Sequence, residues 1–368
     1  MIEQLLKELT EKKGSDLHVK VGSRPMIRID GELQPINGVE VILPKDMEIM
    51  ERELLDERKR EKFRKNKNID FSYAIPALGR YRINMFMQRG TIAVAIRRIL
   101  QNIQSLEKLG LPDVLKEVIK EKRGLILITG AAGNGKSTTV AAMIEYINEN
   151  LTRNIITLED PIEYLFKDKK SLISQREIPS DIENYNQALK YIIRQDPDII
   201  YIGELRDKET LEAAFKAAET GHLVISTVHT VNASQTITRI LDYFPKELQQ
   251  RIRNQLSSNL LMVTSQRLLP KKQGKGRVAA IEVMRTTPTI KDLILTVDGY
   301  KKIPEAMKLG KKEDGMKTFD QSIEKLYTNG EIEYETALSA ATVKKDIQLL
   351  KRGINHASAS DYYKEMIE

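Results

Sequence analysis

The residues from Gly130 to Ser137 read GAAGNGKS and match the pattern G-x-x-x-x-G-K-[ST]. An apolar run (125–129) precedes this segment and a helix-forming run (140–148) follows it. Glycines let backbone N–H groups close around phosphates, and the N-terminus of a helix adds its positive dipole. In this pattern the side chain of Lys136 reaches the β- and γ-phosphates, and the hydroxyl of Ser137 binds Mg²⁺. The segment therefore predicts a P-loop that binds ATP. The residues expected to contact the nucleotide are Gly130, Ala131, Ala132, Gly133, Asn134, Gly135, Lys136, Ser137 and Thr138.

Carboxylates follow two of the later apolar runs. The segment LEDPIEY contains Glu159, Asp160 and Glu163, and YIGELRD carries Glu204 directly after DIIYIG. Hydrolysis of ATP needs a carboxylate that positions the attacking water, and strand ends of one sheet deliver side chains to a common crevice. A single acidic residue at a strand end would more simply cap a helix. Two such clusters after one P-loop favour catalysis, with Glu159, Glu163 and Glu204 as candidates.

Two histidines flank the apolar run of GHLVISTVHT, His222 before it and His229 after it. They lack a third partner for a metal site. Two interpretations remain open from position alone. Both residues can be ordinary capping or hydrogen-bonding histidines, or His229 can sense the γ-phosphate from the carboxyl end of its strand.

Short apolar runs alternate with helical patterns after Pro112. Continuous apolar strands between helices predict a parallel sheet that is covered on both faces. The four runs are LILIT (125–129), NIITL (154–158), DIIYI (198–202) and LVISTV (223–228).

The segment before the P-loop predicts a separate α+β module. A charged run (51–68) predicts one helix, and YRINMFMQ (81–88) alternates apolar and polar residues as a half-buried strand does. TIAVAIRRIL (91–100) is expected to be its hairpin partner. We therefore expect an α+β domain at 1–98, a linker at 99–112, the P-loop core at 113–288 and a helical region at 289–368.

Composition narrows the class of protein. The 368 residues include no Cys, which excludes disulfides and thiolate zinc sites, and four His, which makes a His-only metal site hard to build. No apolar run approaches the ~18 residues of a membrane helix, and the N-terminus lacks a signal peptide's apolar centre, so we expect a cytoplasmic protein. The net charge of +7 favours a solvated mixed-charge surface over nucleic-acid binding. The high content of Lys and Glu favours a thermophilic source.

The four chemical segments occur in the order of the Walker A, Asp box, Walker B and His box motifs, as GAAGNGKST, ITLEDPIEY, IIYIGELRD and GHLVISTVHT. In this the sequence resembles the secretion ATPase superfamily (type II/IV secretion ATPases), and within it most resembles the type IV pilus retraction ATPases. The similarity extends to SDLHVKVGSRPMIRIDGEL (15–33), DFSYAIPALGRYRIN (70–84) and DGMKTFDQSIEKLY (314–327), so it covers nearly the whole chain.

The resemblance implies an α/β fold with a RecA-like P-loop core, an N-terminal PAS-like domain and a C-terminal helical region. It implies a homohexamer that hydrolyses ATP with Mg²⁺ to power pilus retraction and twitching motility. Its expected location is the cytoplasmic face of the inner membrane, against a platform protein at the pilus base. By motif position, Glu204 prepares the water, Glu159 and Glu163 belong to the Asp box, and His222 and His229 to the His box. The family also lends two arginines to the phosphates, here Arg82 and Arg97.

The segment TPTIKDLIL (287–295) matches the subfamily's Ala-Ile-Arg motif only loosely. The rival within the superfamily is a pilus-extension or type II secretion ATPase, but those relatives carry a four-cysteine zinc module. A hexameric nucleic-acid translocase would need stacking aromatics, which are 5% of this chain with no Trp. A nucleotide switch that does not hydrolyse ATP is disfavoured by the presence of Lys136 and Glu204.

Overall fold

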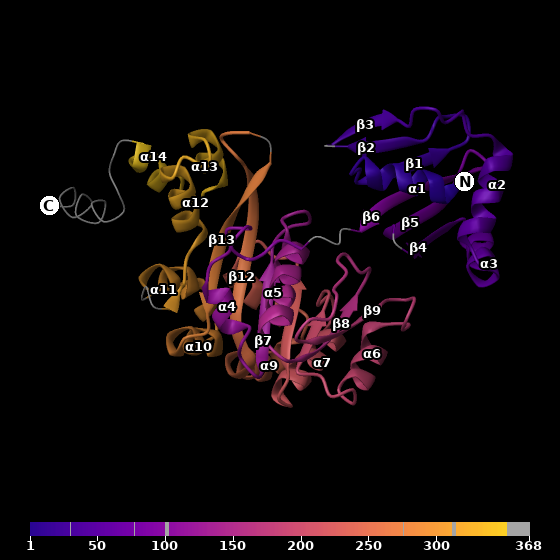
Figure 1. Ribbon diagram of the computed structural model, residues 1–368. Coiled ribbons are helices and arrows are strands. Elements are labelled where there is room, and N and C mark those ends of the chain that lie inside the picture. Colours follow the sequence, from indigo (N-terminus) through magenta and orange to yellow (C-terminus); the bar gives the residue numbers. More distant parts are fainter. Residues whose placement is uncertain (30, 77, 100–102, 275, 311–313, 352–368) are drawn as a thin grey trace. The chain divides into compact units, whose positions relative to one another are not determined.

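The computed structural model describes residues 1–351 apart from 30, 77, 100–102, 275 and 311–313 (Figure 1). The chain forms two compact units. The first unit comprises residues 1–102 together with 161–166, and the second comprises 103–160 and 167–368. The expected linker (99–112) thus spans the boundary, and its residues 100–102 lie outside the described part.

The first unit is built on a six-stranded antiparallel sheet in the order β3-β2-β1-β6-β5-β4. Alternate residues of β5, such as Tyr81, Ile83 and Met85, are fully buried, which confirms the half-buried strand. Its predicted hairpin with β6 is also confirmed. The strands are β1 (Asp16–Lys20), β2 (Met26–Ile29), β3 (Glu32–Pro35), β4 (Asn68–Ile75), β5 (Gly79–Gln88) and β6 (Thr91–Ile99).

Three helices accompany this sheet, α1 (Ile2–Glu11), α2 (Pro44–Leu54) and α3 (Glu57–Asn66). The prediction of a single helix over 51–68 was wrong, because the chain breaks between α2 and α3. At the break Asp56 adopts an extended backbone, and its side chain accepts the N–H of Lys59 at 2.8 Å. Such an N-cap begins a new helix rather than continuing the old one.

The second unit is built on a seven-stranded mixed sheet in the order β13-β12-β7-β11-β10-β8-β9, in which only the β12–β13 pair is antiparallel. The four predicted parallel strands are confirmed as β7, β8, β10 and β11. The strands are β7 (Gly124–Thr129), β8 (Asn154–Glu159), β9 (Leu172–Glu177), β10 (Ile199–Ile202), β11 (Leu223–Val228), β12 (Leu260–Pro270) and β13 (Arg277–Arg285).

Both faces of the central strands are buried, as expected. Leu125 and Leu127 of β7 join a core with the helices that follow, and Ile126 and Ile128, which alternate with them on the other face, are equally inaccessible. The helices of this part are α4 (Val114–Val118), α5 (Lys136–Asn150), α6 (Tyr185–Ile192), α7 (Lys208–Glu219), α8 (Ala233–Asp242) and α9 (Lys246–Asn259).

The helices after Pro288 divide between two cores. Ile290 and Ile303 pack into the main core. Phe319 and Ile323 instead form a separate cluster against the long β12–β13 hairpin, orange in Figure 1. The first group is α10 (Pro288–Leu295), η1 (Gly299–Lys302) and α11 (Ile303–Leu309), and the second is α12 (Phe319–Thr328), α13 (Tyr334–Ala340) and α14 (Lys344–Lys351). Residues 352–368 of the predicted helical region lie outside the described part.

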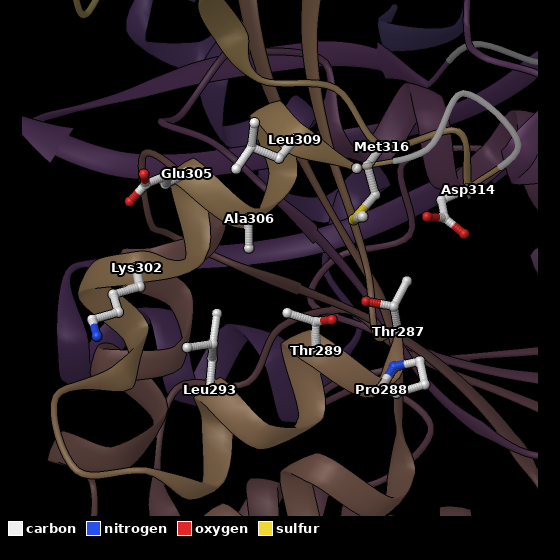
Figure 2. Close-up of a pocket in the computed structure, with 11 residues that line it drawn as sticks. Thr287, Pro288, Thr289, Leu293, Lys302, Glu305, Ala306, Leu309, Asp314 and Met316 are labelled. Atoms are coloured by element: carbon white, nitrogen blue, oxygen red, sulfur yellow. The ribbon is translucent and has the colours of Figure 1, made fainter.

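The segment that loosely matches the Ala-Ile-Arg motif (287–295) contains all of α10 and its N-cap Thr287, and it lines a pocket of about 610 Å³. In Figure 2, Ala306 and Met316 point into the space beside α10. Lys302 and Glu305 contribute charged groups to the lining.

Among the described residues, every helix is too short or too polar to cross a lipid bilayer.

Candidate active site

The P-loop joins β7 to the N-terminus of α5, and its backbone conformation favours glycine at Gly130 and Gly135 among other positions. Gly135 is the N-cap of α5 and has φ +82, in the left-handed region that side chains disfavour. Gly130 has φ +149, and a Cβ there would lie 2.7 Å from the carbonyl oxygen of Gln266 on β12. The loop is tied to the neighbouring hairpin, since Asn134 Oδ1 accepts the N–H of Leu268 at 3.2 Å. These constraints fix the course of the loop backbone against β12.

The side chain of Lys136 lies inside this loop and is only 8% exposed. Its Nζ donates to the carbonyl oxygens of Gly130 at 2.8 Å and Ala131 at 3.3 Å. Nζ also lies 3.3 Å from Nδ1 of His229, which follows the neighbouring strand β11. These contacts hold the ammonium group within the loop. Ser137, in the first turn of α5, is half-buried beside it.

His229 links the P-loop to Glu204. An ammonium group is only a donor, so Nδ1 of His229 is the acceptor of the Lys136 contact and carries no proton. The proton of the neutral ring is then on Nε2, which lies 3.4 Å from Oε1 of Glu204. Glu204 follows β10, the strand next to β11. The side chain of Glu204 is 18% exposed, so the carboxylate is accessible without being fully solvated.

The other oxygen of Glu204 contacts Arg206. Arg206 Nε donates to Glu204 Oε2 at 2.6 Å, and its Nη1 forms an ion pair with Asp160 Oδ2 at 3.7 Å. The hydrogen bond to Glu204 raises the pKa of the Arg206 guanidinium. Asp160 follows β8, the strand next to β10. Five side chains therefore form one contact series along the carboxyl ends of β7, β11, β10 and β8: Lys136, His229, Glu204, Arg206 and Asp160.

Glu159 ends β8 and is 6% exposed. Its Oε1 accepts hydrogen bonds from Thr157 Oγ1 at 2.8 Å and Gln175 Nε2 at 3.1 Å. Gln175 lies on β9, beside β8. Hydrogen bonds to its ionised form stabilise a buried carboxylate, so Glu159 is a fixed acidic group at the edge of the series.

A family model described as Type II/IV secretion system protein matches residues 1–335. The chain is 40% identical over 348 residues to the Type IV pilus ATPase PilU of Pseudomonas aeruginosa, covering 95% of this chain and 90% of that protein. It is also 40% identical over 345 residues to the Type IV pilus retractation ATPase PilT of the same organism, covering 94% and 99%. A crystal structure of the pilus retraction motor PilT with bound ADP is 41% identical, with a TM-score of 0.86, over 94% of this chain and 98% of that one. The chain belongs to the type II/IV secretion system protein family.

Membership of this family confirms the predicted superfamily and the prediction of a nucleotide-binding ATPase with an α/β fold. The roles of individual residues stay predictions, and the structure shows which of them lie together. His229 contacts both Lys136 and Glu204, and Lys136 belongs to the loop from Gly130 to Thr138.

The structure does not bring His222 to this group. His222 precedes β11, whose Leu223 pairs with Gly124, whereas the P-loop follows the opposite end of β7. Six strand residues separate the two ends by roughly 20 Å. His222 Nδ1 instead lies 2.9 Å from the carbonyl oxygen of Ala217 and 3.1 Å from Thr220 Oγ1, at the end of α7. That is the capping geometry that the sequence left open.

Glu163 and the two arginines lie in the first unit. Glu163 is exposed and falls in segment 161–166, outside the unit that holds the P-loop. Arg82 and Arg97 are cross-strand partners on β5 and β6. They line a hollow of about 320 Å³ on one face of the sheet.

Each arginine has a carboxylate partner from a flanking strand. Arg82 Nε lies 3.5 Å from Asp70 Oδ1, and Arg97 Nε donates to Asp16 Oδ1 at 2.9 Å. Burial alone would raise the pKa of Asp16, but hydrogen bonds from Ser15 and Arg97 outweigh it and lower that pKa.

Sequence reasoning missed Arg206 and left Asp160 out of the candidate set. Arg206 stands two residues after Glu204, in a segment that gives no periodic signal of its own. Tyr185, the first residue of α6, was also missed. Burial and the nearby Asp160 raise the pKa of its hydroxyl, which stays protonated at neutral pH. The available signal was the sheet order, because adjacent strand ends bring Asp160 and Arg206 together.

Proposed function

We propose that this chain is the ATP-hydrolysing motor that powers type IV pilus retraction, and hence twitching motility. The observation that carries the chemistry is the contact of Lys136, His229 and Glu204 at the P-loop. Lys136 neutralises charge on the phosphates, and the Glu204 carboxylate orients the attacking water towards the γ-phosphate. His229 touches both groups, which suits it to report the presence of that phosphate. The similarity to the type IV pilus ATPases PilT and PilU supports pilus retraction as the work that ATP hydrolysis drives.

Magnesium fits the oxygen donors present. The Ser137 hydroxyl is in place at the first turn of α5, and Glu204 and Asp160 bring carboxylates to the same sheet edge. Among the described residues, no three His, Cys, Asp or Glu cluster as a metal cage. Mg²⁺ bound with ATP normally takes few protein ligands, keeping waters and phosphate oxygens. Ser137 would hold the ion, which would neutralise phosphate charge.

The assembly we propose is a homohexamer whose first unit is a PAS-like domain. Arg82 and Arg97 of that unit would supply positive charge to the nucleotide phosphates of the same or a neighbouring subunit. Glu163 would contribute to the same site. The partner would be the platform protein of the pilus at the cytoplasmic face of the inner membrane, with no nucleic acid involved.

The test combines turnover and phenotype. Purified protein should hydrolyse ATP without stimulation by DNA or RNA. Deleting the gene should leave cells with abundant surface pili that cannot retract, and wild-type protein, but not Glu204→Gln protein, should restore twitching. Loss of surface pili on deletion would identify an extension ATPase instead. Stimulation of turnover by nucleic acid would identify a translocase.

A further inference from the structure

The ends of β8 and β10 approach each other unusually closely at Gly203. The Gly203 N–H donates to the carbonyl oxygen of Leu158 at 2.7 Å. A Cβ at this position would lie 3.1 Å from that same oxygen and 3.1 Å from the Tyr185 hydroxyl. Only glycine leaves these contacts undisturbed, since 3.1 Å is tighter than an ordinary carbon–oxygen contact. The close approach brings Asp160, at the end of β8, within reach of the residues that follow β10.

Arg206 occupies the position between the two strand ends. It stands between Glu204 Oε2, at 2.6 Å, and Asp160 Oδ2, at 3.7 Å. A guanidinium group is planar and offers several N–H groups in fixed directions, so it can bind two carboxylates at once. The side chain is about half exposed, so this pairing contributes little to stability by itself.

The geometry of the Glu204 carboxylate depends on this arginine. One oxygen faces Arg206 and the other faces Nε2 of His229 at 3.4 Å. Contacts at both oxygens fix the plane of the carboxylate, whereas a contact at one oxygen leaves it free to rotate. A base that orients water must hold its free lone pairs in one direction, and small misplacements cost catalysis heavily.

We propose that Arg206 is a positioning residue that couples Asp160 to Glu204 and sets the plane of the Glu204 carboxylate. The inference rests on the proposed hydrolytic function, because it assigns a task to residues that flank its base. It gives the order of the strand ends a mechanical role: Asp160 acts on the reaction through Arg206 and not by contact with the nucleotide.

The experiment measures ATP turnover and nucleotide affinity for the full chain and for Arg206→Ala, Arg206→Lys and Asp160→Asn, together with the double variant. The matched control is Lys208→Ala, which removes a neighbouring cation whose partner is Glu212 at 4.0 Å on the same helix. Nucleotide affinity is read with ADP, and thermal unfolding reports whether each variant is folded.

A positioning role predicts a fall in kcat of about 10–100-fold for Arg206→Ala, with KM for ATP and affinity for ADP changed less than about threefold. Arg206→Lys should lower kcat less than Arg206→Ala does. Lysine keeps the positive charge but lacks the planar guanidinium group that can bind two carboxylates. Asp160→Asn should lower kcat in the wild-type background and have no further effect in the Arg206→Ala background. Lys208→Ala should match the wild type.

Wild-type kcat in Arg206→Ala, or losses that multiply in the double variant, would overturn the proposal. If Arg206→Ala fails to fold, Arg206→Lys and Asp160→Asn decide the matter, and wild-type kcat in both would be the contrary result. Failure of the proposed function is distinguishable from these outcomes. It would appear as no turnover by the wild-type chain, or as unchanged turnover in Glu204→Gln.

Discussion

Lys136 Nζ and His229 Nδ1 lie 3.3 Å apart across the ends of β7 and β11. Because the ammonium group can only donate, the contact fixes the tautomer of the ring and points its remaining N–H to the side of Glu204. A phosphate that draws Lys136 away would therefore also change what His229 offers to Glu204. This relationship connects the nucleotide-binding residue to the carboxylate through one side chain.

Replacing Lys136 with Ala should abolish ATP hydrolysis, because no other side chain of the loop neutralises the phosphates. The fold should survive. The carbonyl oxygen of Gly130 loses its 2.8 Å donor, which costs about 1 kcal/mol in the free energy of unfolding. Steady-state turnover and thermal unfolding measure the two effects. Near-wild-type turnover would refute the P-loop assignment.

Replacing Glu204 with Gln should retain nucleotide binding and lower turnover by about 10²–10⁴-fold, the range that general acid–base steps supply. The amide keeps the shape of the side chain but loses the negative charge that polarises water. Glu163→Gln is the matched comparison, since it removes one exposed carboxylate from the Asp box. Greater damage from Glu163→Gln, with little from Glu204→Gln, would move the base assignment to Glu163.

The parallel strands could be predicted because each is a continuous apolar run buried on both faces. β12 and β13 could not, since Thr264, Ser265 and Gln266 interrupt the apolar pattern with buried polar residues. The Ser265 hydroxyl and the Gln266 amide nitrogen bond to residues that are distant in the sequence, whereas the Thr264 hydroxyl and the Gln266 amide oxygen are buried without a hydrogen-bond partner among the described residues. Thr129 donates to Ser265 at 2.9 Å and Gln266 donates to Thr139 at 2.8 Å. A local pattern contains no information on partners more than a hundred residues away.

The same limit applies to the site. Motif spacing identified Lys136, Glu204 and His229, because each motif carries its residue at a fixed offset from a strand. The bridge from Asp160 to Arg206 depends on β8 and β10 being neighbours in the sheet, and strand order does not follow chain order here. His222 shares a motif with His229 yet lies at the opposite end of the strand. Sequence proximity to a motif is therefore weaker evidence than the strand end a residue occupies.

Replacing Glu282 with Gln should stabilise the second unit at neutral pH. Burial raises the pKa of Glu282, although the N–H of Ala233 donates to its Oε1 at 2.7 Å. A carboxyl group with a raised folded-state pKa contributes its stability below the unfolded pKa and loses it as pH rises through the folded value. The advantage of the Gln variant in melting temperature should thus be present at pH 8, shrink as the pH falls below the raised folded-state pKa, and be lost below the unfolded value of about 4.3.

Thermal unfolding between these pH values checks the expectation, with the exposed Glu335→Gln as control. A Gln variant that is less stable than the wild type at pH 8, or a difference that does not change with pH, would contradict it. Lower stability at pH 8 would mean that the interactions of the ionised carboxylate with Ala233 and Arg267 outweigh its burial, and a difference that does not change with pH would mean that the two effects balance.

Arg82 and Arg97 should be required for turnover but not for nucleotide binding. They are cross-strand partners, and like charges directly opposite each other destabilise a sheet. Asp70 on β4 and Asp16 on β1 offset that repulsion from the two flanking strands, at 3.5 Å and 2.9 Å. A costly pair retained with its own counter-charges is expected where two cations are needed together. The simpler interpretation is a set of exposed ion pairs worth under about 1 kcal/mol.

The two interpretations differ in kinetics. Arginines that meet the transferring phosphate are worth about 10³–10⁵ in rate, so Arg82→Ala or Arg97→Ala should cut turnover steeply while ADP affinity changes little. Exposed ion pairs predict unchanged turnover. Mixing Arg82→Ala protein with Lys136→Ala protein then tests whether the site is shared, because each inactive subunit would supply the group that the other lacks. Activity recovered in the mixture would place the arginine in a neighbour's site. Two single variants with wild-type turnover would end the proposal, since no shared site could then depend on them.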